Sequence, residues 1–208
     1  MYVMTLDQRG SSRGEDIVPG TLRRLNELSR RDGLVLRFER TAGDEMQGTL
    51  SSPQAVVGVV TATLRADSWR IGIGVGEVTM PLPRSTRAAR GTAYVAARAA
   101  IEAARTSPQH LSVVGAPGYG GLDMVSFDRA ITNAESALWL LTSLLRRRTP
   151  DGWQVVDLVN TGMSQREVAE QLEISASAVS QRLRRAGFLE EQRGRDLASS
   201  LLALGEAA

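Results

Sequence analysis

The chain has 208 residues, of which 42% are hydrophobic and 23% are charged, and this composition fits one large or two small folded domains rather than a disordered chain. Cysteine is absent, which excludes disulfides and thiolate metal sites. No apolar run approaches the roughly 18 residues of a membrane span, and the first residues lack the basic and apolar regions of a signal peptide. We therefore expect a cytoplasmic protein with no membrane partner.

All 25 basic residues are arginine, and they are unevenly distributed. Residues 1–150 carry 19 arginines and 14 acidic residues, a net charge of +5, whereas residues 151–208 carry 6 and 9, a net charge of −3. An acidic segment is unfavourable for DNA binding, because sequence-independent affinity comes from neutralised phosphates. Within that segment, however, Arg182, Arg184 and Arg185 form a cluster, and residues 146–148 add three arginines just upstream.

The first 127 residues alternate between strand and helix patterns. In chain order we expect a strand at 2–6, a helix at 17–31, a turn at 32–33, strands at 34–39 and 46–50 joined by a turn at 41–45, a helix at 53–65, a strand at 69–79, a helix at 92–105, a strand at 111–114 and a glycine-rich loop at 115–121. This order predicts an α/β or α+β sheet with helices packed on it.

Three glycines alternate within the expected strand at 69–79: Gly72, Gly74 and Gly76. A dinucleotide-binding fingerprint requires a helix that opens directly after its glycines, and no helix pattern follows here. A bulge or a close approach of another backbone is the better explanation for glycines inside a strand.

Residues 130–148 predict a long helix with a broad apolar stripe, which is buried either between two domains or against a second subunit. Thr-Pro-Asp-Gly at 149–152 ends this helix. Leucines at 197, 201, 202 and 204 predict a last amphipathic helix. We therefore expect a sheet domain at 1–127, a connecting or dimerisation helix at 128–149 and a helical domain at 150–208.

The helical domain contains two short helices joined by a tight turn. Ser164 and Glu167 form a capping-box pattern that starts the first helix. Residues 173–175 form the turn, Ser175 can cap the second helix, and Gly187 ends it. Val179 and Leu183 face inward, so small, polar and arginine side chains face outward.

This segment resembles the helix-turn-helix of bacterial regulators and of the promoter-reading region of sigma factors, although Glu173 stands where those families usually have glycine. Small outer residues let the second helix approach base edges, where Gln181 and Arg184 can pair with adenine or guanine. Arg166, Arg182 and Arg185 are better placed for phosphates. The expected DNA-binding residues are Arg166, Ser175, Ala176, Ser177, Ser180, Gln181, Arg182, Arg184 and Arg185. The alternative is a structural three-helix unit with solvated arginines.

Three acidic residues stand where strands meet loops: Asp7 after the first strand, and Asp44 and Glu45 at the hairpin tip. If the first strand lies beside the hairpin, these carboxylates converge. Converging carboxylates suit Mg²⁺, which prefers oxygen ligands and often binds a substrate phosphate as well. The alternative is a polar hairpin turn without a ligand.

The order of elements and the sequence Ala42-Gly43-Asp44-Glu45-Met46 resemble the palm-like domain of nucleotide cyclases and diguanylate cyclases. Together with residues 70–77 and 91–94, they resemble the SatD family, which implies an α+β fold with a ferredoxin-like, palm-type sheet followed by an all-α helix-turn-helix domain. The resemblance further implies that Asp7 and Asp44 bind metal. The implied ligand-binding residues are Asp7, Gly43, Asp44, Glu45, Arg90 and Arg98. The two arginines would bind a phosphate of the ligand; an equal alternative is that they lie on a solvated helix face.

These patterns predict a DNA-binding transcription regulator, a homodimer whose palm-like domain senses a nucleotide or second messenger such as a cyclic dinucleotide. The alternative is a Mg²⁺-dependent nucleotidyl cyclase or transferase with an accessory DNA-binding domain. A third possibility is a palm-like domain that serves only as a dimerisation scaffold.

Overall fold

The computed structural model describes residues 1–11, 14–29, 33–66, 68–119 and 124–205. Within these residues one five-stranded sheet forms in the order β2-β3-β1-β4-β5. The strands are β1 (Tyr2–Gln8), β2 (Leu34–Arg40), β3 (Glu45–Leu50), β4 (Trp69–Val75) and β5 (Leu111–Gly115). Neighbouring strands are antiparallel except for the parallel pair β4 and β5. The first four strands have the ferredoxin-like order, which confirms the expected α+β fold.

The two faces of the sheet are covered by different helices. Along β1, Tyr2, Met4 and Leu6 point into the main core together with residues of α1 (Val18–Leu28) and α2 (Pro53–Thr63). Val3 points the other way, against Ala93 and Ala97 of α3 (Thr92–Ala103). This alternation is the side-chain period of two that a strand imposes, so both faces of β1 are buried.

Helix α3 lies directly on the glycines of β4. A Cβ atom at Gly74 would come within 2.2 Å of the Ala93 carbonyl oxygen and the Ala97 amide nitrogen, and one at Gly72 within 2.4 Å of the Ile101 amide nitrogen. These distances confirm that the glycine pattern marks a close backbone approach.

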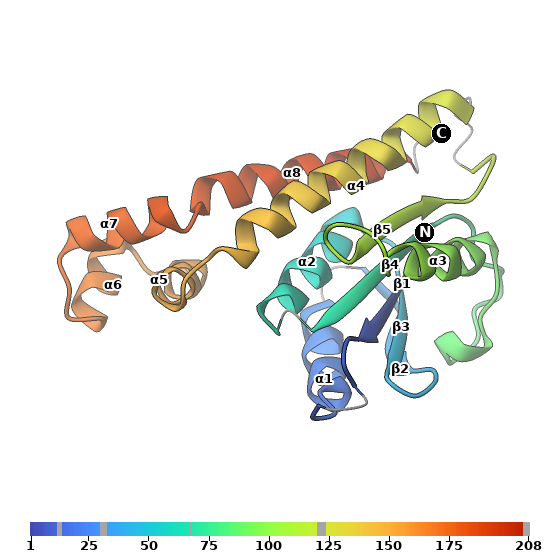
Figure 1. The fold of residues 1–208 in the computed structure, drawn as a ribbon, viewed down its shortest axis with the longest axis horizontal. Helices are drawn as coiled ribbons and strands as arrows, with labels where there is room; N and C mark the ends of the chain where they lie inside the picture. The colour runs from blue at the N-terminus through green and yellow to red at the C-terminus, as the bar shows by residue number, and fades with distance from the viewer. Residues whose placement is uncertain (12–13, 30–32, 67, 120–123, 206–208) are drawn as a thin grey trace.

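The apolar stripe of the long helix is buried by the chain itself. Helix α4 (Met124–Arg146) runs beside α8 (Phe188–Leu204) along the sheet (Figure 1). Its apolar residues join the main core with Ala198 and Leu202 of α8. Glu135 and Trp139 of α4 cover the outer edge of β5, where they bind the Val113 amide and the Leu111 carbonyl, at 2.7 and 2.8 Å. Neither contact requires a second subunit.

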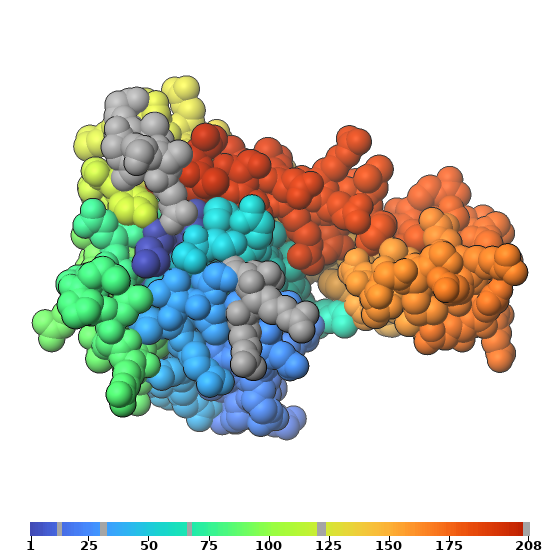
Figure 2. Space-filling view, turned by 180° about the vertical axis from the view of Figure 1, so that it is seen from behind, coloured from blue at the N-terminus to red at the C-terminus, as the bar shows by residue number. Residues whose placement is uncertain are grey.

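Three short helices form a separate unit with its own core: α5 (Pro150–Asn160), α6 (Gln165–Gln171) and α7 (Ala176–Arg185). Figure 2 shows this unit standing away from the sheet and its helices. The core consists of Val155, Val156, Val168, Ala169, Val179, Leu183 and Ala186. Helix α8 leaves this unit and returns to the main core, so the residues after 187 pack mainly with the first part of the chain.

Several element ends differ from the expected ones. β1 continues to Gln8, which places Asp7 within the strand, and β4 ends at Val75 because the chain turns away at Gly76. Helix α4 begins at Met124, six residues before the expected start. The expected helix end at 30–31, part of the turn at 32–33 and Gly120 and Gly121 of the expected loop lie outside the described residues. In the part of the chain that is described, no helix combines the length and apolar character needed to cross a membrane.

Candidate functional site

The start of α6 is held by a reciprocal cap. The Glu167 amide donates to Ser164 Oγ over 3.3 Å, and Glu167 Oε2 accepts from the Ser164 amide over 2.7 Å. The sequence prediction of a capping box is therefore confirmed. Glu167 Oε2 also accepts from the Ser164 hydroxyl over 2.8 Å. The bond from the Ser164 amide and, after it, the one from the hydroxyl lower the pKa of Glu167 because they favour the ionised carboxylate.

The turn between α6 and α7 uses a left-handed residue. Glu173 has a φ of +52°, a conformation that glycine adopts most easily. The next amide, of Ile174, donates to the Ala169 carbonyl over 3.0 Å, and the Ile174 side chain packs on the core of the unit. Ser175 then caps α7 by accepting from the Ala178 amide over 3.1 Å. Glu173 thus takes a left-handed geometry that glycine adopts at lower cost.

The outer face of α7 is available to a partner. Val179 and Leu183 are buried, as expected. The residues predicted to bind DNA are exposed at Arg166, Ser175, Ala176, Ser177, Gln181, Arg184 and Arg185, and partly buried at Ser180 and Arg182. This face therefore combines small side chains with one amide and several guanidinium groups.

The arginines near α7 differ in whether they form ion pairs. Arg182 lies 3.1 Å from Asp151, and Arg166 lies 3.1 Å from Glu170 on its own helix. Arg184 and Arg185 make no ion pair within the described residues. Arg148 of the upstream arginine run is buried and paired with Glu191, so it does not belong to this surface.

The acidic residues at the sheet are only partly brought together. Asp7 lies opposite Glu45 on β3 and Arg70 on β4, and its Oδ2 is 2.8 Å from Arg70 Nη1. Glu45 accepts from the Thr41 hydroxyl over 2.6 Å and lies 3.7 Å from Arg98. The convergence of Asp7 and Glu45 follows from the register of β1 and β3, and Arg70 is a member of this group that the sequence did not indicate.

Gly43 and Asp44 line a shallow cavity of about 310 Å³ on the other side of the hairpin turn. Its remaining walls are Gln8, Ser11, Asp16 and Arg40. Asp16 and Arg40 form an ion pair of 2.5 Å, and the hydrogen bond from Arg40 lowers the pKa of the Asp16 carboxyl. Sequence reasoning missed Asp16 and Arg40. Only the position of Arg40, directly before the turn, could have suggested it.

The two arginines expected to bind a phosphate, Arg90 and Arg98, differ in their contacts. Arg98 is paired with Glu45 and, over 2.9 Å, with Glu102. Arg90 is exposed, and among the described contacts only its carbonyl is engaged, by the Thr79 amide over 2.8 Å. The contacts of Arg98 therefore link α3 to the hairpin, whereas Arg90 stays at the surface.

The acidic group does not form a ready cage for a cation. No cluster of three or more acidic or histidine side chains with metal-binding geometry occurs among the described residues. The Asp7 carboxylate faces the Arg70 guanidinium, and a divalent ion there would have to displace that arginine. The carboxylates and guanidinium groups instead offer both hydrogen-bond acceptors and donors to a polar ligand.

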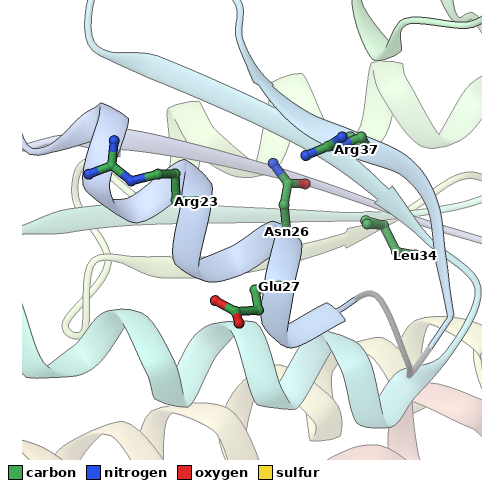
Figure 3. A pocket seen from close by; sticks show the side chains of 5 residues that line it. All are labelled: Arg23, Asn26, Glu27, Leu34 and Arg37. Atoms are coloured by element: carbon green, nitrogen blue, oxygen red, sulfur yellow. The ribbon is translucent and has the colours of Figure 1, made fainter.

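A wider cavity, of about 530 Å³, lies between α1 and β2 (Figure 3). Arg23 and Arg37 stand on opposite sides of Asn26 in this view. The Asn26 amide is already used, because it donates to the Phe38 carbonyl over 3.0 Å and accepts from the Phe38 amide over 2.8 Å. Asn26 therefore fixes α1 to the edge strand.

No model of a known protein family matches the chain, and no curated protein matches it. The functional argument consequently depends on the fold and on the geometry of these sites.

Proposed function

We propose that the chain is a DNA-binding transcription regulator in which α6 and α7 form a helix-turn-helix. The observation that carries the proposal is the outer face of α7, which projects from the molecule with small side chains, Gln181 and Arg184 exposed. A recognition helix needs such a surface because it enters the major groove and contacts base edges. The cap at Ser164 and the left-handed turn at Glu173 support the same motif.

The roles of the side chains follow from their positions. Ala176, Ser177 and Ser180 are small enough for the helix to approach the bases, while Gln181 and Arg184 can form paired hydrogen bonds with adenine and guanine. Arg166, Arg182 and Arg185 flank this strip and bind phosphates. Because residues 151–208 have a net charge of −3, sequence-independent affinity is low and specific contacts dominate.

The regulator acts as a homodimer in this proposal, since a helix-turn-helix commonly reads two half-sites. The apolar stripe of α4 no longer supports a dimer, because α8 and β5 cover it. Leu197 and Leu204 on α8 remain exposed, at 53% and 52% of their surface, and offer an apolar surface for a second copy.

The sheet domain senses a nucleotide or second messenger at the hairpin. The cavity beside Gly43 and Asp44 supplies carboxylates and the Arg40 guanidinium. We do not extend the proposal to nucleotidyl transfer, because Asp7, the carboxylate that would hold the catalytic metal, faces Arg70. Thermal-shift measurements with nucleotides and cyclic dinucleotides, with and without Mg²⁺, test this site. If Asp44→Ala responds to these ligands as the wild type does, the ligand site does not lie at the hairpin.

The DNA proposal is tested by recovering bound genomic fragments and measuring their affinity at low and moderate salt. Arg184→Ala is expected to lose about 1–3 kcal/mol of discrimination at one guanine of the recovered site. Arg193→Ala, an exposed arginine on α8, is the matched control and should keep full discrimination. Failure of the wild-type protein to prefer any genomic fragment would refute the proposal.

A further inference from the structure

The segment that leads from β4 into α3 carries only positive charges. Residues 78–101 contain four arginines, at positions 84, 87, 90 and 98, and no acidic residue, although the whole chain has 25 arginines and 23 acidic residues. Arg98 is paired with Glu45 and Glu102, so its charge is compensated. The other three arginines lie within residues 79–90, which we call the basic arm.

The three arginines of the basic arm are accessible to a partner. Arg84, Arg87 and Arg90 are all exposed. Among the described residues, their side chains form no ion pair and no hydrogen bond. Two carboxylates lie close to the arm along the chain or in space: Glu77 precedes it, and Glu39 accepts a hydrogen bond from the Ser85 hydroxyl. Neither neutralises an arm arginine through an ion pair within the described structure.

The backbone of the arm is held in place at its base and in its middle. The Thr79 amide donates to the Arg90 carbonyl over 2.8 Å, which closes the arm at its base. The short helix η3 (Thr86–Ala88) contacts β2 and β3, and the buried Thr86 hydroxyl lies 3.2 Å from the Tyr94 hydroxyl of α3. A partner therefore binds arginines on an ordered backbone, and the entropy lost on binding is confined largely to their side chains.

We propose that the basic arm binds the phosphate backbone of a nucleic acid, independently of its base sequence. Guanidinium groups pair with phosphate oxygens through charged, often bidentate hydrogen bonds. Several exposed guanidinium groups along a loop suit a row of phosphates, whereas a small anion is usually enclosed in a cavity. Neither the hairpin cavity nor the cavity between α1 and β2 includes an arginine of the arm.

A membrane with anionic lipids would attract the same charges but fits the arm less well. Segments that bind such lipids through charge contain about four to eight basic residues, and the arm has three. Insertion into the lipid interface needs a helix with a continuous apolar face. In the arm, Met80 is the exposed large hydrophobic residue, and Leu82 packs with Val3 and Val78 instead.

The basic arm lies at the end of the molecule opposite α6 and α7 (Figure 1, green, lower right). It therefore contacts a different stretch of nucleic acid from the one at α7. Residues 151–208, with a net charge of −3, contribute little sequence-independent affinity, and the arm supplies it for the chain as a whole. Phosphate binding by the arm does not depend on the proposed helix-turn-helix.

The test measures the affinity of the full chain for a random-sequence DNA duplex at several salt concentrations. The logarithm of the association constant falls with the logarithm of the salt concentration, by about 0.9 for each phosphate contact. Arg84→Gln combined with Arg87→Gln should therefore reduce this slope by about 1.8. The matched control, Arg23→Gln combined with Arg24→Gln, removes two exposed arginines of α1 and should leave the slope unchanged.

Equal slopes in the wild type and the arm variant would overturn the proposal, as would a wild type that does not bind the duplex at low salt. An equal reduction in both double variants would also overturn it, because the effect would then come from net charge alone. Vesicles of phosphatidylserine and phosphatidylcholine in equal amounts test the membrane: loss of vesicle binding in the arm variant with an unchanged DNA slope would assign the arm to lipid. Arm-dependent binding of random DNA by a protein that prefers no genomic fragment would support the arm and refute only the proposed regulator.

Discussion

Glu173 carries the backbone strain of the turn between α6 and α7. A non-glycine residue in the left-handed region costs about 1–2 kcal/mol, and Glu173 adopts a φ of +52° without a structural partner for its side chain among the described contacts. Glu173→Gly should therefore raise the free energy of unfolding of this unit, by up to about 1 kcal/mol. The gain is reduced because glycine loses more backbone conformational entropy on folding than glutamate does. Chemical denaturation measures this. Glu170→Gly, within α6, should instead lower it by about 1 kcal/mol.

The cap at Ser164 makes α6 sensitive to acid. The pKa of Glu167 is lowered from its usual 4.5 by the hydrogen bonds from Ser164, so the cap stabilises the folded state fully above that value and loses its effect as the pH falls through the lowered pKa. We expect Glu167→Gln to reduce the pH dependence of stability below about pH 4.5. Thermal unfolding from pH 3 to 6 measures it, and an identical acid dependence in wild type and variant would contradict this.

At the scale of elements, the contact of α3 with β4 has no room for a methyl group. Gly74→Ala would place a carbon 2.2 Å from backbone atoms of α3. The backbones of β4 and α3 would have to move apart to relieve this clash. We expect a loss of about 3 kcal/mol or more in unfolding free energy, at the upper end of overpacking effects. Denaturant titration measures the loss.

Gly58 is the matched control for this substitution. It lies in α2, and a methyl carbon added there would meet no atom within 4 Å beyond its chain neighbours and the nearby backbone of its own helix, while alanine favours a helix interior by about 1 kcal/mol over glycine. Gly58→Ala should therefore leave stability equal or raise it. Similar losses in both variants would show that α3 does not lie on β4 as closely as described.

Across the whole molecule, a buried ion pair joins the segment between α4 and α5 to α8. The side chains of Arg148 and Glu191 are 0% and 4% exposed and lie 2.7 Å apart. Glu191→Ala leaves the buried guanidinium without its carboxylate and should cost about 3–5 kcal/mol. The exposed neighbour Glu190 is the control, and Glu190→Ala should change stability by less than about 0.5 kcal/mol. Thermal and denaturant unfolding of both variants compare these losses.

A double substitution separates charge from packing at this pair. Arg148→Met combined with Glu191→Leu removes both charges and retains most of the volume, so stability should return close to that of the wild type. A double variant as unstable as Glu191→Ala would show that the packing around residues 148 and 191, rather than the unpaired charge, determines the loss.

Local patterns in the sequence were enough for most helices, the strands and the caps. The cap at Ser164, the buried Val179 and Leu183 and the glycines opposite α3 depend on nearby residues or on a single close contact, so spacing alone predicted them. The ends of β1 and β4 were misplaced, because strand length depends on the neighbouring strands: β1 is paired as far as Gln8 with β4, which no local pattern records.

The sequence by itself determined the alternation of strands and helices, the two short capped helices and the outward position of Arg184, because backbone preferences and hydrophobic period act over a few residues. The patterns left α/β and α+β open, and the sheet order decided for α+β. Only the tertiary structure decided which groups meet across the chain: Asp7 with Arg70, Asp44 beside Asp16 and Arg40, and Arg148 with Glu191. It also decided that α8 of this chain, rather than a second subunit, covers α4. Such contacts join residues tens of positions apart, and their geometry is set by sheet register and helix packing.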